Sequence, residues 1–397
     1  MILKLALTFF VLFTAYTVWS YLRERKYRKK PFYGLADIGW RTIQPPPTES
    51  RIHSVALVGD IGNAGPVETD SVMQSIKDWL DTEGAKSTIV FLGDNIYPVG
   101  LPPEGHRHHQ NALQKLYYQL ELFKSYEGKV VYLGGNHDWN KGRRNGLTYA
   151  LRQERTICEA LNDPLAFLPK NATLGPVPLE INDHLLLIVI NTQWWVQKGE
   201  KPRRLYPDQE ETNPEAFFSA LQLLLEKNKH RFVIIAAHHP LYSNALHGGK
   251  FTVKQQLFPL TFINKKAMLP LPMAGLAFRL YRKYIGATED MSFPPFKRFR
   301  KKILKLLHQY SNFFYVGGHD HNLQYFQVKG GHYAVSGSGS KTNFVAKGGK
   351  ATFSHENKGF MVLDHYQDGS VWLRVLEPSE ETPKKTIIAF QKCLYKT

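Results

Sequence analysis

Five short motifs rich in aspartate and histidine stand out in this chain, and each follows directly after an apolar run. The runs at 55–58, 88–92, 129–133, 232–235 and 313–316 have the length and composition of buried strands. The carboxyl ends of strands meet at one edge of an α/β sheet, so residues distant in sequence converge there. The motifs are Gly59-Asp60-Ile61-Gly62, Gly93-Asp94-Asn95-Ile96-Tyr97, Gly135-Asn136-His137-Asp138, Ile235-Ala236-Ala237-His238 and Gly318-His319-Asp320-His321.

The side chains of these motifs are oxygen and nitrogen donors, and no thiolate is among them. Such a donor set suits one or two ions of Fe, Zn or Mn, and fits neither a Cys-rich structural zinc site nor a copper–thiolate site. A Gly-Asp pair alone is usually a turn. The joint occurrence of all five motifs, in order after strand-like runs, therefore predicts a metal-dependent hydrolase.

The motifs resemble those of the calcineurin-like metallophosphoesterase superfamily, and within it the branch of the purple acid and tartrate-resistant acid phosphatases. That branch has G-D-x-G in its first motif and a tyrosine in G-D-x-x-Y, and this chain has Gly62 and Tyr97 at those places. The resemblance covers about residues 51–375 outside a long insertion. It implies a four-layer α/β/β/α sandwich of two mixed sheets.

Carried over to this sequence, the resemblance implies two metal ions per chain that share Asp94 as a bridging ligand. A bridging carboxylate is physically reasonable because two neighbouring cations repel each other. The implied ligands are Asp60, Asp94, Tyr97 and His321 for the first ion, and Asp94, Asn136, His238 and His319 for the second. The Tyr97 phenolate favours Fe(III) at the first site, with Fe, Zn or Mn at the second.

Two further histidines are implied to be catalytic. By resemblance, His137 faces the phosphate and His247 protonates the leaving group. Asp138 could orient the ring of His137, and His239 is a candidate for an outer-sphere role. We therefore expect a dinuclear phosphatase in which a metal-bound hydroxide attacks a phosphomonoester. A phosphodiesterase or pyrophosphohydrolase acting on nucleotides or phospholipid head groups, and a non-catalytic metal-binding scaffold, remain the alternatives.

The amino terminus differs from the rest, since Leu5–Leu22 carries no charge and is about long enough to span a bilayer. We expect a single-pass membrane anchor with a basic flank at 1–30, a linker at 31–50, and a metallophosphoesterase domain at 51–397 with a basic insertion at 250–310. Six basic residues follow the span and Lys4 precedes it, which favours a cytoplasmic catalytic domain, whereas family precedent often points outside. Sidedness stays open.

The formal net charge of +17 is concentrated in two segments. Residues 1–30 contribute +6, and the insertion, with thirteen Lys/Arg and two acidic residues, contributes +11. Residues 297–307 of the insertion read as a basic amphipathic helix, which either lies on anionic lipid or packs its apolar face on the core. The expected partners are a phosphorylated small molecule and a membrane. The membrane would be contacted through the anchor and, if the helix at 297–307 lies on lipid, through the insertion as well. No nucleic acid is expected, because no recognised nucleic-acid module accompanies the charge. The oligomeric state is open.

Overall fold

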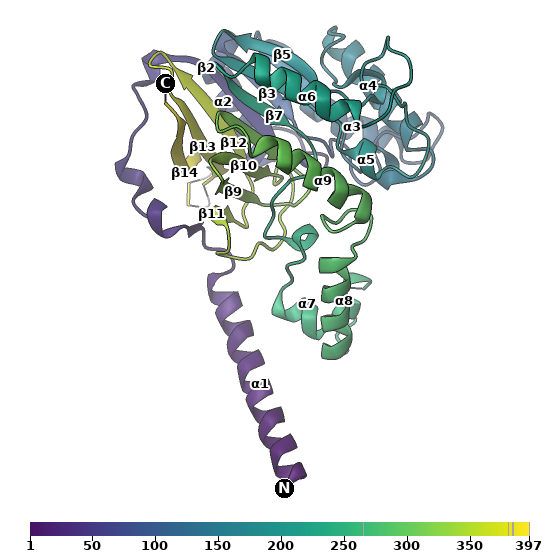
Figure 1. The fold of residues 1–397 in the computed structure, drawn as a ribbon, viewed down its shortest axis with the longest axis vertical. Helices are drawn as coiled ribbons and strands as arrows, with labels where there is room; N and C mark the ends of the chain where they lie inside the picture. Colours follow the sequence, from purple (N-terminus) through teal and green to yellow (C-terminus); the bar gives the residue numbers. More distant parts are fainter. Residues whose placement is uncertain (265, 380, 383–384, 397) are drawn as a thin grey trace.

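Two β-sheets lie face to face in the computed structural model, which describes residues 1–264, 266–379, 381–382 and 385–396 and omits the side chains of 2–3, 6–7 and 9–10 (Figure 1). The six-stranded sheet has the order β14-β13-β12-β2-β3-β4, and the eight-stranded sheet has the order β1-β11-β9-β10-β8-β7-β6-β5. Each sheet contains both parallel and antiparallel pairs. The predicted pair of mixed sheets is therefore confirmed.

The strands of the six-stranded sheet are β2 (Arg51–Val58), β3 (Ser87–Phe91), β4 (Lys129–Tyr132), β12 (Phe360–Tyr366), β13 (Val371–Pro378) and β14 (Thr386–Tyr395). Those of the eight-stranded sheet are β1 (Phe32–Tyr33), β5 (Val177–Asn182), β6 (Leu185–Val189), β7 (Phe232–Ala236), β8 (Phe313–Gly317), β9 (Leu323–Val328), β10 (Gly331–Ser336) and β11 (Ala351–His355). The helices are α1 (Ile2–Tyr27), α2 (Ser71–Glu83), α3 (His109–Leu120), α4 (Gly146–Leu161), α5 (Gln193–Val196), α6 (Ala216–Lys227), α7 (Val253–Leu257), α8 (Pro272–Tyr284) and α9 (Pro294–Leu307).

Three apolar clusters separate four layers. The central cluster joins the inner faces of the two sheets, for example Leu57 and Val90 with Ile234 and Phe314. On the other faces of the same strands, α2 and α3 cover the six-stranded sheet, and α6 and α9 cover the eight-stranded sheet. Every second residue of a strand points to the same face, so a continuous apolar run such as 55–58 serves both clusters.

The five predicted strands that precede the motifs are all present, as β2, β3, β4, β7 and β8. In the first sheet β2, β3 and β4 are parallel neighbours, and in the second β7 and β8 are parallel neighbours. Each motif therefore leaves a carboxyl end of a strand, and the facing sheets bring these ends to one edge.

The prediction of an N-terminal transmembrane helix is wrong, and so is the single-pass localisation built on it. Within the described residues, no helix is apolar over enough of its length to cross a membrane. The helix α1 does form, but Thr14, Tyr16, Thr17 and Ser20 interrupt its apolar run and charged residues fill its last turns. This charged end is attached to the body of the protein: the Val253 amide donates to Glu24 at 2.9 Å, and Arg28, just past the helix, donates to Glu356 at 2.6 Å.

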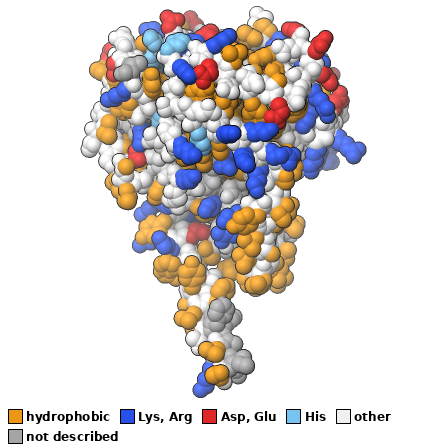
Figure 2. All heavy atoms as spheres, in the orientation of Figure 1, with side chains coloured by type: hydrophobic (Ala, Val, Ile, Leu, Met, Phe, Trp, Pro, Cys, Tyr) orange, Lys and Arg blue, Asp and Glu red, His pale blue; other side chains and the backbone are white. Residues whose placement is uncertain are grey.

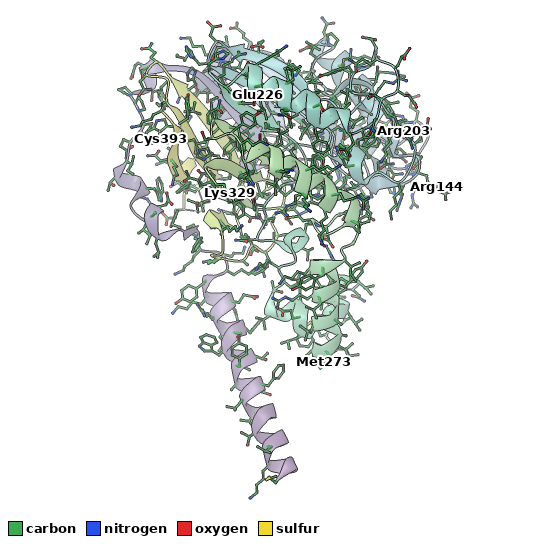
Figure 3. All side chains as sticks on the ribbon, in the orientation of Figure 1. Arg144, Arg203, Glu226, Met273, Lys329 and Cys393 are labelled. Atoms are coloured by element: carbon green, nitrogen blue, oxygen red, sulfur yellow. The ribbon has the colours of Figure 1, made fainter. Side chains whose placement is uncertain are left out.

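The segment 250–310 forms α7, α8 and α9. Helix α9 packs on the eight-stranded sheet and buries Phe299, Ile303 and Leu307, while its lysines at 301, 302 and 305 are exposed. The apolar face of α9 is thus occupied by the core and is not free to lie on lipid. Helix α8 projects beside α7 away from the sheets, and Met273 near its first turn is 77% exposed (Figure 3).

Candidate metal centre

The candidate centre lies where the loops after the five strands meet, and hydrogen bonds within and between the two sheets fix its geometry. The His319 amide donates to Asp60 Oδ2 at 2.7 Å, and the Gly318 amide donates to the His238 carbonyl at 2.8 Å. His238 Nδ1 lies 2.8 Å from the Leu92 carbonyl, which leaves Nε2 directed at the centre. The predicted ligands of both sheets are thereby held in one place.

The first group of donors converges on the Tyr97 hydroxyl. Its oxygen lies 2.8 Å from Asp60 Oδ1, 3.1 Å from Asp94 Oδ2 and 3.1 Å from His321 Nε2. Asp60 follows β2, Asp94 and Tyr97 follow β3, and His321 follows β8. They form a compact set of three oxygens and one nitrogen.

The second group converges on the Asn136 amide oxygen. This Oδ1 lies 2.9 Å from His238 Nε2 and 3.1 Å from His319 Nδ1, and the two nitrogens are 3.2 Å apart. Asp94 Oδ1 is 3.4 Å from His238 Nε2. Asp94 therefore directs one carboxylate oxygen at each group, as the bridging role requires.

The two buried carboxylates perturb each other. Burial, together with the negative charge of Asp94, raises the pKa of Asp60 to about 7. Burial also acts to raise the pKa of Asp94, but His137 and His238 outweigh it and hold that pKa below its ordinary value. Burial and the two carboxylates raise the pKa of the Tyr97 hydroxyl. Bringing these acidic groups together in a dry site favours a cation among them.

Burial favours the neutral form of His321 and His319, which is the form that binds metals. Burial, reinforced by the Lys341 charge, lowers the pKa of His321 to about 3, and burial lowers the pKa of His319. Neutral imidazoles, carboxylates, an amide oxygen and a phenol oxygen are the ligand types of Fe, Zn and Mn. The residues present therefore fit a pair of such ions, with Asp60, Asp94 and His321 in one group.

The backbone at the centre is unusual in a way that the sequence does not reveal. Asp60, Asp94 and His319 adopt left-handed conformations with φ of 60°, 56° and 70°. Such conformations cost free energy in residues other than glycine and cluster at functional sites. They turn the three side chains sharply inward from the ends of their strands.

His137 lies at the rim of the centre, but Asp138 does not orient it. His137 Nδ1 is 2.6 Å from the Pro98 carbonyl and its Nε2 is 3.7 Å from Asp94 Oδ2. The predicted contact between Asp138 and the His137 ring is therefore wrong. The Asp138 carboxylate instead accepts hydrogen bonds from the amides of Asn95 and Gly135, so it joins the loops after β3 and β4.

His247 lies in the 3-10 turn Leu246–Gly248, with its ring centroid 4.1 Å from that of His319. Its amide donates to Asp320 Oδ1 at 3.3 Å, and its Nδ1 is 3.2 Å from Asp290 Oδ1. Burial acts to lower the pKa of His247, but the carboxylates of Asp320 and Asp290 more than offset it and raise that pKa. A protonated imidazole beside the centre is what a general acid requires.

Sequence reasoning missed Glu289 and Asp290, which come from the insertion. Glu289 Oε1 accepts a hydrogen bond from Asn136 Nδ2 at 3.0 Å, and the Glu289 carbonyl lies 2.8 Å from His319 Nε2. These contacts turn the Asn136 oxygen and His319 Nδ1 toward the second group. The available signal was that 289 and 290 are the two acidic positions of a strongly basic segment.

His239 is a third imidazole near the second group, within 4.8 Å of the other two. Its Nδ1 lies 3.0 Å from Thr192 Oγ1, and its buried Nε2 has no hydrogen-bond partner among the described residues. Lys341 also borders the first group, with its ammonium 3.2 Å from the centroid of the Tyr97 ring. Neither residue belongs to the predicted ligand set.

A model of the calcineurin-like phosphoesterase family matches residues 53–265, which is more than half of the chain. The chain belongs to the calcineurin-like phosphoesterase family. The predicted resemblance is confirmed, and membership of a phosphoesterase family supports the prediction of a phosphoric ester hydrolase. The family implies a dinuclear metal centre, and the aspartate and histidine side chains for it are present.

Among relatives, Purple acid phosphatase 3 of Arabidopsis thaliana is 24% identical over 236 residues, which cover 57% of this chain and 58% of that protein. The match thus spans less than two thirds of the relative's length. Among solved structures, GAP50, the anchor in the inner membrane complex of Plasmodium, has a TM-score of 0.47 at 15% identity and covers 86% of this chain and 89% of its own. Purple acid phosphatase PPD1 from seeds of yellow lupin (Lupinus luteus) has a TM-score of 0.47 at 14% identity, over 87% of this chain and 55% of its own.

The pH dependence of activity tests the role of Asp290. Replacing Asp290 by asparagine removes a carboxylate that raises the pKa of His247, so the alkaline limb of the kcat/KM profile is expected to move to lower pH. The sign follows because a raised pKa keeps the imidazolium populated to higher pH. The control is Arg282→Gln, which removes the cation paired with Asp290 and leaves the carboxylate in place. An unchanged alkaline limb in Asp290→Asn, or the same downward shift in the control, contradicts this role.

Proposed function

We propose that this chain is a dinuclear metal-dependent phosphatase that hydrolyses phosphomonoesters. The single observation that carries the proposal is that Asp94 directs one oxygen at the Asp60–Tyr97–His321 group and the other at the Asn136–His238–His319 group. Two cations bound there would activate water and neutralise charge on the phosphate. We further propose Fe(III) at the Tyr97 group, because a phenol oxygen among carboxylates suits a hard trivalent ion.

The other side chains have separate roles in this proposal. His137 lies at the rim with its Nδ1–H donated to the Pro98 carbonyl, and when the ring is protonated its Nε2–H stabilises the negative charge that develops on the phosphoryl oxygens. Asp320 and Asp290 raise the pKa of His247, and in its protonated form His247 donates a proton to the oxygen of the leaving alcohol. Glu289 keeps the Asn136 oxygen aimed inward.

Activity of the full chain with Fe, Zn or Mn supplied tests the proposal. We expect turnover of p-nitrophenyl phosphate from acidic to neutral pH, and slower turnover of bis(p-nitrophenyl) phosphate. A preference for the diester would replace the proposal by a phosphodiesterase. A folded, metal-loaded protein without turnover of either ester would favour a non-catalytic metal-binding scaffold.

The Tyr97 ligand can be tested separately by absorption spectroscopy. With Fe(III) bound, a phenolate ligand is expected to give a charge-transfer band in the visible region, and Tyr97→Phe is expected to abolish it. Tyr132→Phe is the matched control, because that hydroxyl is buried and has no hydrogen-bond partner among the described residues. A visible band that survives in Tyr97→Phe would show that another group binds the iron.

A further inference from the structure

A hollow of 290 Å³ opens beside His247, and the insertion forms most of its wall. The cationic residues that line it are Arg282, Lys283, Lys297 and Arg300. Tyr242 and His247 also line it. Figure 2 shows Lys and Arg side chains gathered over α9, in the middle of the face drawn. Four basic residues of the insertion therefore lie next to the candidate general acid.

The cations of the hollow differ in whether their charge is already balanced. Arg282 forms an ion pair with Asp290, which is buried. For Arg300 the structure shows no carboxylate partner within the described part of the chain. Its Nε donates to the Leu241 carbonyl at 2.5 Å, and its guanidinium carbon lies 5.3 Å from the centroid of the Tyr242 ring. A largely buried guanidinium without a counter-ion is costly unless an anion reaches it.

Two lysines add to the excess of positive charge at this place. Lys297 and Lys283 are exposed and border the hollow. A third, Lys350, lies with its ammonium 5.5 Å from the centroid of the Tyr242 ring. The local charge balance therefore favours a ligand that carries negative charge.

The position of the hollow relates it to the metal centre. His247 borders the hollow, and its ring centroid is 4.1 Å from that of the predicted ligand His319. A phosphomonoester at the centre, with its leaving oxygen at His247, would extend its alcohol portion toward the hollow. A second anionic group on that portion would come to Arg300.

We propose that the hollow binds a second anionic group, a phosphate or a carboxylate, on the alcohol portion of the substrate, with Arg300 as its main contact. This inference rests on the proposed phosphatase function and names its substrate class. Arg300 is a specificity residue, because it contacts a part of the substrate that does not react. A charge-assisted, bidentate contact of this kind is expected to lower KM by about tenfold.

Two matched substrate series test the proposal with the full chain. One compares glycerol phosphate, phosphoglycerate and glycerol bisphosphate, and the other compares a hexose monophosphate with the hexose bisphosphate. We expect a KM about tenfold lower for substrates with a second anionic group, with little change in kcat. The phosphoglycerate and bisphosphate arms distinguish which anionic group is preferred. Arg300→Gln is expected to remove the KM preference for substrates with a second anionic group.

Two further variants separate binding from folding. Arg298→Gln is the matched control, because Arg298 is an exposed arginine on the same helix that does not line the hollow. Lys297→Gln, at an exposed border position, should weaken the preference even if Arg300→Gln disturbs the fold. Equal KM values within both series, or a preference that survives in Arg300→Gln and Lys297→Gln, would overturn the inference. If the unmodified, metal-loaded protein does not hydrolyse p-nitrophenyl phosphate, that result would instead count against the proposed function.

Discussion

Asp94→Ala is expected to release both metal ions and to lower kcat for p-nitrophenyl phosphate by more than about 10³-fold, because a group that stabilises both halves of the centre is lost. The expectation follows from the two Asp94 oxygens, which lie 3.1 Å from the Tyr97 hydroxyl and 3.4 Å from His238 Nε2. Metal content is measured by elemental analysis after desalting.

Asp81→Ala serves as the control for Asp94→Ala. Asp81 is a solvent-exposed aspartate of α2 whose partner is Lys77, so its loss should change neither metal content nor turnover. Circular dichroism and thermal unfolding would show that both variants keep the fold. A folded Asp94→Ala protein that retains two ions per chain would contradict the bridging role.

The second large effect, on stability and metal binding, is expected from adding one methyl group at Gly135. A Cβ at Gly135 would lie 2.3 Å from Asp94 Oδ1 and 2.5 Å from the Asp94 backbone nitrogen. The nitrogen cannot move away, because it belongs to the loop that supplies Asp94. Gly135→Ala is therefore expected to destabilise the fold by about 1–3 kcal/mol, measured by denaturant unfolding, and to lower metal affinity and turnover by more than about 10²-fold.

The adjacent glycine provides the comparison for Gly135→Ala. A Cβ at Gly134 would meet Trp139 Nε1 at 3.2 Å, the edge of a side chain that can shift slightly. Gly134→Ala should consequently retain most of its stability and metal. Equal loss in the two variants would mean that the loop after β4 tolerates no side chain anywhere, and that the close approach to Asp94 is not the reason.

The sequence was sufficient to predict where the site would form. Each motif follows an apolar run, and Asp60, Asp94 and Asn136 follow three parallel neighbours of one sheet. Parallel strands end at the same edge, so their convergence follows from local pattern alone. The same reasoning placed His238 and His319 after β7 and β8.

What the sequence could not provide were contacts made by chain far from any motif. Glu289 and Asp290 reach Asn136 and His247 only because α8 and α9 bring the turn between them over the centre. No periodicity or spacing encodes that path. The prediction that Asp138 orients the His137 ring is wrong for a related reason. Asp138 is next to His137 in sequence, but buried backbone amides bind its carboxylate instead.

The prediction for the N-terminal segment is wrong for a different reason. Residues 5–22 carry no charge, but polar and aromatic side chains interrupt the run and charged turns continue the same helix. The amphipathic pattern of 297–307 was compatible with lipid or with a core, and only the presence of the eight-stranded sheet under α9 decides between them.

The most direct test of the account is an anomalous diffraction measurement on crystals of the metal-loaded protein. Two peaks are expected about 3.5–4 Å apart, with Asp94 between them. One should lie among Asp60, Tyr97 and His321, and the other among Asn136, His238 and His319. A single peak, or a second peak held by His239 in place of Asn136, would contradict the proposed dinuclear centre.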